Sequence, residues 1–592
     1  MNSLEQKYAC QESKFLTTLG TTIYVASRTE KTKDCSDTFC GERGSFANPS
    51  LCLGEAFDLA ESKSKGKDIK FAIEILTKEI VGSEETSAVL IPSSVISIAG
   101  AEEGTNVSGL DELILNHSVK IQNLLGLGTI LKVEPESAEL SNRKIKAEEF
   151  TDAGDEGEAI EEPEAKRNFD AVISSSQFKG LNVSIPEDYN AKLALDKVDV
   201  LQDQDGAGLP MSISAADGSN FRLQWVDGQL VATNGTFYCA PRTVLQIDMQ
   251  NVDATLQGLS VGNTEGGNLI LSRSNGVWNY TGEGEKVNVG CVECRNENEC
   301  KNPDTSSKNC PCKRPCKIGS TTLSDDNMNF TAPKTVRAIE AVGGEFVKVE
   351  RNNVKYLQNP NEEDGNVKYL RNANEEDDDN LLDTNIDSTG YTEDSERVEI
   401  DGKEVINALG GTKGMIARNK YTDVGLLLSA DGEGTILNII HNRIGPARLL
   451  ALNASNKAEL NHISKDVNVG SREKPATVAY AATTGGKITT NQKGGIQNLS
   501  GINANIGSSS FFQQIRRNVE VLFVPGTGDA YAENYNQEPV DEGVEGTGGK
   551  ISLTDRNVNI QTVAAFRNLS GKILEQILRN TNIDRKSTRL NS

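Results

Sequence analysis

The chain is short of aromatic residues, of apolar residues and of histidine. Aromatic residues make up 5% of its 592 residues, apolar residues other than glycine make up 36%, and there are 3 histidines. A conventional large α/β enzyme needs a thick hydrophobic core, and this composition argues against one. Glycine, with 54 residues, and asparagine are abundant instead. Both tolerate the left-handed backbone conformation of tight turns, so a turn-rich protein is expected.

Positive charge is also in short supply. Lys and Arg total 61 against 85 Asp and Glu, which gives a formal net charge of −24. An acidic surface repels phosphate backbones, so no nucleic-acid partner is predicted. No uninterrupted apolar run approaches the about 20 residues of a membrane-spanning helix, and the N-terminal residues lack the apolar core of a secretory signal peptide. The sequence therefore predicts no membrane span and shows no signal peptide.

The N-terminal part has the pattern of a strand, a turn, a short helix and a second strand. Strands are expected at Thr21–Ser27 and Ile69–Leu76, with a Gly-Ser-x-x-Asn-Pro turn at Gly44–Pro49 between them. Apolar residues at helical spacing predict a helix over Leu53–Lys65. These apolar residues are Leu53, Ala56, Phe57 and Ala60. This order resembles the entry cap of pectin-lyase-like right-handed parallel β-helices, and the resemblance implies that stacked strands follow.

Short strands of alternating apolar and polar residues fill much of the remaining chain. Examples are Leu181–Ile185, Phe221–Trp225, Ile436–Ile440 and Val519–Phe523. We therefore predict an all-β fold, a right-handed parallel β-helix (a solenoid) with a short capping helix and acidic disordered insertions. Tandem β-sandwiches are the alternative, because they contain similar short strands and the sequence has no fixed repeat period. A second short helix is predicted over Lys572–Arg579 from its apolar spacing.

Acidic and repetitive segments interrupt the strands. Residues 134–164 are rich in Asp and Glu, and residues 353–378 are a tandem duplication in which 10 of 13 positions are identical. Such segments cannot build a core, so residues 134–164 and 353–400 are expected to be solvated and mobile. The residues from Arg585 to Ser592 resemble translated sequencing-adapter read-through and are expected to be an artefact. The predicted organisation is an N-terminal arm at 1–20, cap and first rungs at 21–133, an acidic insertion at 134–168, rungs at 169–290, a Cys-rich loop at 291–318, an acidic repeat-containing insertion at 319–400, a second β-rich block at 401–584 and the artefact at 585–592.

Six of the eleven cysteines lie close together in the Cys-rich loop. A Cys-x-x-Cys pair can supply two ligands of a tetrahedral zinc, but the second half of the cluster has Cys-x-Cys spacing and no histidine lies nearby. Closely spaced cysteines can also staple a small coreless loop as three disulfides. Disulfides, a zinc site and free thiols therefore stay open for this cluster. Its members are Cys291, Cys294, Cys300, Cys310, Cys312 and Cys316.

Catalytic patterns are sparse. Asp203 and Asp205 have the spacing that places two carboxylates on one strand face, as a glycosidase requires, but Gly206 and Pro210 favour a turn there. The letters Gly-x-Ser-x-Gly around Ser260 match a hydrolase motif without the helix that must follow it. The aspartates are therefore weak enzyme candidates. No cofactor and no other catalytic residue is predicted, and no metal site is predicted apart from the zinc alternative for the cysteine cluster.

Three functions are compatible with these observations. The first is a non-catalytic structural or attachment protein, such as a virion surface fibre, whose partners are other structural proteins, surface glycans or further copies of the chain. The solenoid-like composition and low-complexity insertions resemble proteins of large DNA viruses of aquatic protists, which implies a virion or extracellular surface. The second is a polysaccharide lyase or glycoside hydrolase on the same β-helix. The third is an adhesin that binds glycans without cleaving them.

Overall fold

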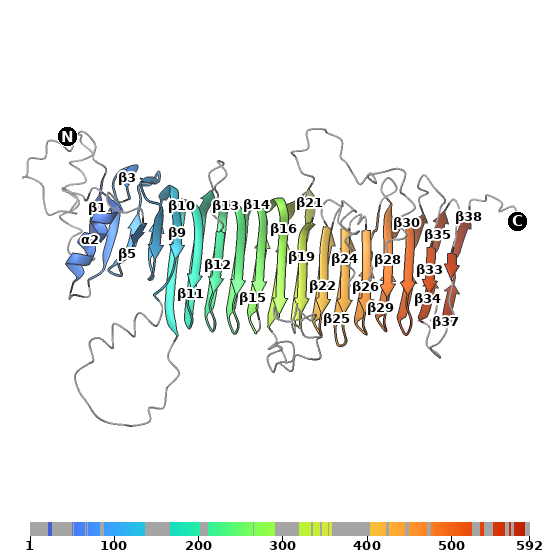
Figure 1. Ribbon diagram of the computed structural model, residues 1–592. Coiled ribbons are helices and arrows are strands. Elements are labelled where there is room, and N and C mark those ends of the chain that lie inside the picture. Colours follow the sequence, from blue (N-terminus) through green and yellow to red (C-terminus); the bar gives the residue numbers. More distant parts are fainter. Residues whose placement is uncertain are drawn as a thin grey trace, which may run out of the picture. The chain divides into compact units, whose positions relative to one another are not determined.

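Figure 1 shows the computed structural model of the chain. The chain comprises two compact units. Unit 1 comprises Met1–Ile213 and Ser219–Ala232, and unit 2 comprises Ser214–Gly218 and Thr233–Ser592. The expected arm at 1–20 and Cys-rich loop at 291–318 lie outside the described residues, as does most of the acidic insertion. The structure describes residues 22–26, 50, 52–65, 67, 69–82, 88–136, 166–201, 211–264, 266–290, 319–332, 335–343, 346–352, 354–357, 403–421, 425–444, 449–470, 475–523, 533–537, 549–562, 567–569 and 573–585.

The described part of unit 1 contains the helix α2 (Leu53–Ser64) and a series of strands, the last two of which continue into unit 2. The strands are β1 (Thr22–Val25), β2 (Phe71–Ile75), β3 (Glu79–Val81), β4 (Ala88–Leu90), β5 (Val95–Ala99), β6 (Thr105–Ser108), β7 (Glu112–Leu115), β8 (Lys120–Gln122), β9 (Leu124–Val133), β10 (Arg167–Ile185), β11 (Tyr189–Leu201), β12 (Met211–Ala215) and β13 (Asn220–Cys239).

The described part of unit 2 consists of strands and their connections. The strands are β14 (Val244–Asn263), β15 (Asn268–Ser274), β16 (Val277–Gly290), β17 (Ser320–Asp326), β18 (Asn329–Thr331), β19 (Thr335–Val342), β20 (Phe346–Asn352), β21 (Lys355–Leu357), β22 (Lys403–Leu409), β23 (Lys413–Tyr421), β24 (Gly425–Asp431), β25 (Ile436–Ile444), β26 (Leu449–Ser455), β27 (Glu459–Lys465), β28 (Ala476–Ala482), β29 (Lys487–Lys493), β30 (Ile496–Ile506), β31 (Phe511–Arg517), β32 (Glu520–Phe523), β33 (Glu533–Gln537), β34 (Lys550–Arg556), β35 (Asn559–Thr562), β36 (Arg567–Leu569), β37 (Ile573–Arg579) and β38 (Asn582–Arg585).

The helix predicted over Leu53–Lys65 is confirmed as α2. Its buried residues are the four apolar residues that the sequence placed at helical spacing, so the apolar stripe faces the core of unit 1. The Sγ atom of Cys52 caps the helix by accepting a hydrogen bond from the backbone N–H of Glu55 at 3.4 Å. Glu55 in the first turn and Lys63 in the last turn complement the helix dipole.

The strands of unit 2 form three parallel ladders, which successive strands of the chain join in turn. The first ladder runs from β14 through β15, β17 and β20 to β37. The second is described in two stretches, β14–β16–β18–β21 and β30–β32–β35–β38. The third contains β16, β19, β22 and the strands that stack on them as far as β36. The all-β prediction is therefore confirmed, and the parallel pairing does not fit the antiparallel sheets of tandem β-sandwiches.

Two predictions were wrong. The helix expected over Lys572–Arg579 is the strand β37, which pairs with β34 in register from Lys550↔Ile573 to Arg556↔Arg579. Apolar residues at 573, 574, 577 and 578 fit either element, and pairing with an existing strand edge satisfies the backbone and overrides the local pattern. The insertion expected at 319–400 begins too early, because β17 to β21 occupy most of 320–357.

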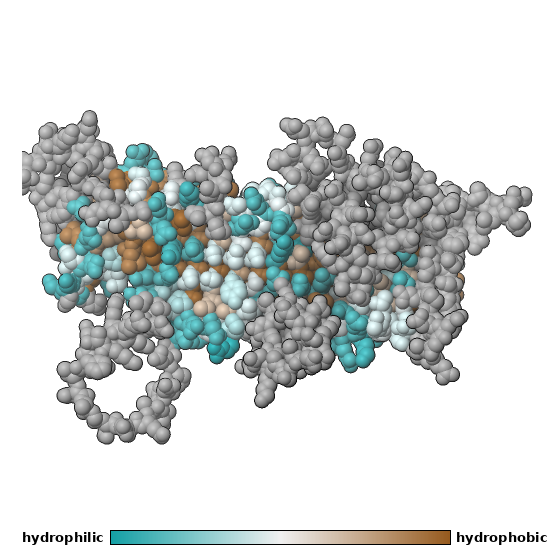
Figure 2. Space-filling model, viewed as in Figure 1, coloured by the Kyte–Doolittle hydropathy of each residue, from teal (hydrophilic) through white to brown (hydrophobic). Residues whose placement is uncertain are grey.

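Inward-pointing side chains alternate with outward-pointing ones along the strands. β15 shows the pattern, with Leu269, Leu271 and Arg273 buried and the residues between them partly exposed. On the face seen in Figure 2, hydrophobic areas are interspersed with hydrophilic ones. Exposed apolar side chains of unit 1 include Leu90 and Ile96, which are 49% and 48% exposed. Apart from such exceptions, the apolar side chains of the strands point to the interior, away from water.

Single residues in the left-handed conformation turn the chain from the first ladder to the second. Asn518, Asn557 and Asn580 occupy such corners, with φ of 54°, 54° and 52°. Their side chains are joined by hydrogen bonds of 3.1 Å and 3.2 Å, so the asparagines stack as a ladder. Asn275 and Asn327 repeat the arrangement at 2.8 Å. These stacked pairs are 39, 23 and 52 residues apart, which explains why the sequence has no fixed repeat period.

We expect Asn557→Ala to lower the free energy of unfolding by about 1–2 kcal/mol, because alanine strains the left-handed corner and removes both side-chain hydrogen bonds. Asn557→Gly loses the same hydrogen bonds without the strain and should be less destabilising. Urea unfolding followed by circular dichroism measures both. Equal destabilisation by the two variants would show that the corner conformation contributes nothing.

Candidate functional site

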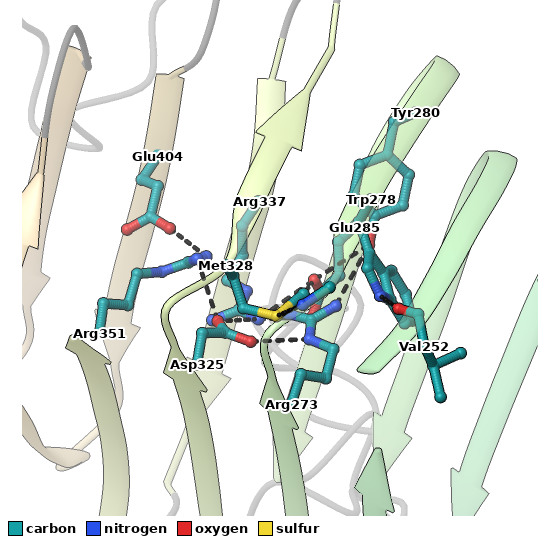
Figure 3. A network of polar contacts seen from close by, with 11 residues as sticks. Val252, Arg273, Trp278, Tyr280, Glu285, Asp325, Met328, Arg337, Arg351 and Glu404 are labelled. Atoms are coloured by element: carbon teal, nitrogen blue, oxygen red, sulfur yellow. Dashed lines mark hydrogen bonds and ion pairs between the residues drawn. The ribbon is translucent and has the colours of Figure 1, made fainter. Parts of the chain in front are cut away.

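Six ionisable side chains lie together in the interior of unit 2 (Figure 3). Three are guanidinium groups and three are carboxylates, so the formal charges cancel. Each side chain is at most 1% exposed. We call this set the charge lattice, and its members are Arg273, Glu285, Asp325, Arg337, Arg351 and Glu404.

The first row of the charge lattice lies on the first ladder. Arg273 of β15 is in register with Asp325 of β17, and Asp325 is in register with Arg351 of β20. The Nε atom of Arg273 donates to Asp325 Oδ1 at 2.7 Å, and Arg351 Nη1 lies 3.0 Å from Asp325 Oδ2. The central carboxylate therefore holds a guanidinium on each side.

The second row lies on the third ladder and has the opposite order of charges. Glu285 of β16 is in register with Arg337 of β19, which is in register with Glu404 of β22. Arg337 Nη2 lies 3.0 Å from Glu285 Oε1 and 3.1 Å from Glu285 Oε2. Figure 3 shows the two rows facing each other, so that every member lies opposite a member of the other sign.

Contacts between the rows complete the charge lattice. The outer pair, Arg351 and Glu404, is an ion pair through Arg351 Nη2 and Glu404 Oε1. In the other two pairs, Arg273 Nη2 lies 2.9 Å from Glu285 Oε2 and Arg337 Nη2 lies 3.1 Å from Asp325 Oδ2. The six charges therefore form a continuous network across three successive strands of each ladder.

Aromatic rings border the charge lattice on the β16 and β18 side. The guanidinium carbon of Arg273 lies 4.5 Å from the ring centre of Trp278 and 5.1 Å from that of Phe330, and the guanidinium carbon of Arg351 lies 4.9 Å from the Phe330 ring centre. Tyr280 is buried, and its hydroxyl lies 3.4 Å from Arg273 Nη1 and 3.3 Å from Glu285 Oε2. The rings add cation–π attraction to desolvated cations, where it is strongest.

The guanidinium groups of the charge lattice lower the pKa values of two of its carboxyls. Burial alone would raise the pKa of the Asp325 carboxyl, but Arg273, Arg337 and Arg351 hold it well below its ordinary value. Burial likewise opposes ionisation of Glu285, and Arg273 and Arg337 lower its pKa. Since both folded-state pKa values are depressed, the stabilisation by these carboxylates is present above about pH 4 and is lost as the pH falls through the folded values.

The geometry suits internal pairing better than contact with a substrate. All six side chains are buried, and each carboxylate has an oxygen within 3.1 Å of a guanidinium nitrogen. Desolvation makes a buried ion pair costly, but removal of one partner costs more because the other charge is left buried and uncompensated. The charge lattice therefore couples the stacking of β15–β17–β20 to that of β16–β19–β22, because displacement of either set would leave buried charges uncompensated.

The candidate site residues predicted from the sequence are different ones. Asp203, Asp205 and the six clustered cysteines lie outside the described residues. Ser260 is an exposed residue within β14, and β15 follows that strand, so the helix that a nucleophile elbow needs does not follow. The charge lattice was missed, although a signal was present. In Leu269–Ser274 the alternation that buries Leu269 and Leu271 also points Arg273 inward.

The side chains of His117, His462, Cys52 and Cys239 are partly or wholly buried. His117 Nε2 lies 2.7 Å from the carbonyl oxygen of Val95, and Nδ1 lies 2.9 Å from Asn116 Oδ1. Burial lowers the pKa of His462 to about 4. Cys52 and Cys239 are free, and burial raises the pKa of the Cys239 thiol to about 12, which suppresses the reactive thiolate.

Comparison with protein-family models, with curated proteins and with solved structures finds no match for this chain. Within the described residues, α2 is too short to be a candidate membrane span, and no other helix qualifies.

We expect Asp325→Asn to lower the free energy of unfolding by about 3–5 kcal/mol, because it leaves an uncompensated buried positive charge. The double variant Asp325→Asn/Arg337→Gln keeps the charge lattice neutral and leaves the Arg273–Glu285 and Arg351–Glu404 pairs in place, so it should recover part of that loss. The matched surface variant Asp217→Asn removes the exposed pair with Arg242 and should cost at most about 1 kcal/mol. Denaturant unfolding compares the three, and a double variant no better than Asp325→Asn would contradict charge balance as the cause.

We expect His462 to make the protein less stable as the pH falls from about 6.5 to 4, since the unfolded state binds a proton that the folded state excludes. The loss should approach about 1.4 kcal/mol per pH unit over that window. His462→Gln should remove this component of the slope. His117→Gln should keep it and remove only the component that comes from the lowered pKa of His117 itself. Unfolding measured at pH 7, 6, 5 and 4 tests this, and an unchanged slope in His462→Gln would contradict the buried neutral imidazole.

Proposed function

We propose that the chain folds as a right-handed parallel β-helix and serves as a structural or attachment protein without turnover of its own. The fold proposal is supported by the three parallel ladders of unit 2, which the chain joins in turn, and by the corner asparagines stacked between the first two. Right-handedness follows from the strong preference of parallel crossover connections for that hand.

The observation that supports this function is that buried ionisable side chains of unit 2 pair with one another. Six of them form the charge lattice, where each charge is compensated by neighbours on adjacent strands. Such pairing contributes rigidity and a fixed order of stacking at the expense of desolvation. A stiff stack of strands offers long outward faces on which many weak contacts can add up, as a structural or attachment protein requires.

The location and partners belong to the same proposal. A net charge of −24 keeps a surface protein soluble and limits adhesion to other anionic surfaces. We propose the surface of a virion or of a cell as the location, with other structural proteins or surface glycans as partners.

The purified full-length chain should not shorten polysaccharides, whether or not it binds them. Incubation with pectins, alginates and sulfated algal glycans, followed by sizing of the polymers and assay of new reducing ends, is expected to give no products. Cleavage that disappears in the Asp203→Asn/Asp205→Asn variant would overturn the proposal in favour of a lyase or hydrolase. Cleavage that persists in the variant would also overturn it, with a different catalytic group.

A further inference from the structure

A row of exposed cations crosses five neighbouring strands of unit 2. Each residue is in register with the next, through β27, β29, β31, β34 and β37. Strands β29, β34 and β37 are labelled in the orange-to-red part of Figure 1. We call this row the basic ladder, and its members are Lys465, Lys493, Arg517, Arg556 and Arg579, all of them exposed.

The described residues around the basic ladder do not neutralise it. None of its five side chains forms an ion pair with another described residue, and this includes the nearby acids Asp466 and Glu520. Two acids on the same face are engaged elsewhere. Glu459 lies 3.4 Å from Lys487, and Glu575 lies 3.7 Å from Lys550. Among the described residues of this face, the five cations are therefore the unbalanced charge, on a chain whose net charge is −24.

Stacking in register brings the five cations close together. Successive strands are about 4.8 Å apart, so each cation has a like charge within about 5 Å of its backbone position. Like charges directly opposite each other on neighbouring strands are destabilising. An anion with its charges at the same spacing would relieve this repulsion along the whole row at once.

The neighbouring rows add neutral contacts. Two positions back along each strand, about 7 Å away, lie Ile463, Asn491 and Ile515, of which Ile463 is 50% exposed. A further two positions back, Asn461, Thr489 and Gln513 are partly exposed and carry amides or a hydroxyl. Aliphatic side chains can pack on the C–H faces of sugar rings, and amides and hydroxyls can hydrogen-bond to sugar hydroxyls. The face therefore combines cations with contacts suited to a carbohydrate.

We propose that the basic ladder binds a linear sulfated glycan that lies across the strands, along the direction of stacking. Charges repeated along an extended sugar chain can meet successive strands, and the three terminal oxygens of a sulfate ester allow it to accept from two successive cations. The inference deepens the attachment role proposed above and rests on it.

Nucleic acid fits the same row less well. Proteins that bind single strands without sequence preference stack the bases on successive aromatic side chains. On the described part of this face Phe511 is a lone aromatic residue, 5.9 Å from Lys550 Nζ, and its neighbours on the adjacent strands, Lys487 and Lys550, are not aromatic.

The test uses the full-length chain with dextran sulfate, alginate, neutral dextran and oligo-dT as probes. The ladder variant is Lys465→Gln/Lys493→Gln/Arg517→Gln. The matched control is Arg242→Gln/Lys286→Gln/Lys457→Gln, which removes the same residue types from exposed positions of unit 2 that form ion pairs. Circular dichroism verifies that both variants are folded, and affinity is measured by calorimetry at two salt concentrations.

Dextran sulfate should bind the native chain, more weakly at high salt, and the ladder variant should lose at least about tenfold in affinity while the control changes by less than about twofold. Neutral dextran should not bind. Equal losses in both variants, no binding of dextran sulfate, or tighter binding of alginate or oligo-dT would overturn the inference.

Sizing of the dextran sulfate after the binding experiment separates this inference from the proposed function. Intact polymer with ladder-independent binding refutes the basic ladder and leaves the attachment role standing. Polymer that is bound through the basic ladder and then shortened refutes the absence of turnover while the site stands.

Discussion

In-register parallel pairing is the constraint on which the other features of this protein depend. Once a strand pairs with the next strand of its ladder, equivalent residues lie directly above one another at about 4.8 Å. The polarity or charge of a side chain is then either the same as that of its neighbour on the next strand or complementary to it. Asparagines that stack gain a hydrogen bond, as at Asn557, whereas charges that stack must alternate in sign or repel.

Charges stack differently in the interior and on the exterior of unit 2. In the charge lattice, where water is excluded, the sign alternates from strand to strand, since an uncompensated buried charge would be prohibitively costly. On the outer face, five cations of one sign stack without alternation, because solvent screens them. A stack of like charges in water is tolerable, and it is also the arrangement that an external polyanion can exploit.

The sequence predicted the all-β class and the capping helix because both depend on local patterns. The apolar spacing from Leu53 to Ala60 belongs to one helix face, and short alternating strands are local as well. The pairing partner of a strand is not local. Thr335 to Val342 and the residues around Asp325 were assigned to an insertion because a neighbouring acidic repeat suggested solvation, whereas both are strands with buried charges. Similarly, Ile573–Arg579 has a helical pattern, and only the edge of β34 decides in favour of a strand. Glu285 and Arg337 meet across 52 residues of sequence, so no reading of either neighbourhood could pair them.

The alternating signs of the charge lattice also have a consequence for folding. A chain whose ladders contain many similar short strands can misplace one of them, so that a strand stacks on a neighbour one layer too early or too late. A displacement by one layer of the third ladder against the first would set Arg273 opposite Arg337 and Asp325 opposite Glu404, with like charges facing each other in a dry interior. Apolar interiors tolerate such errors, because one leucine packs against another in either position. The charge lattice thus selects the correct order of layers during the assembly of unit 2. A displacement by one layer would be higher in free energy because like charges would face each other in the interior.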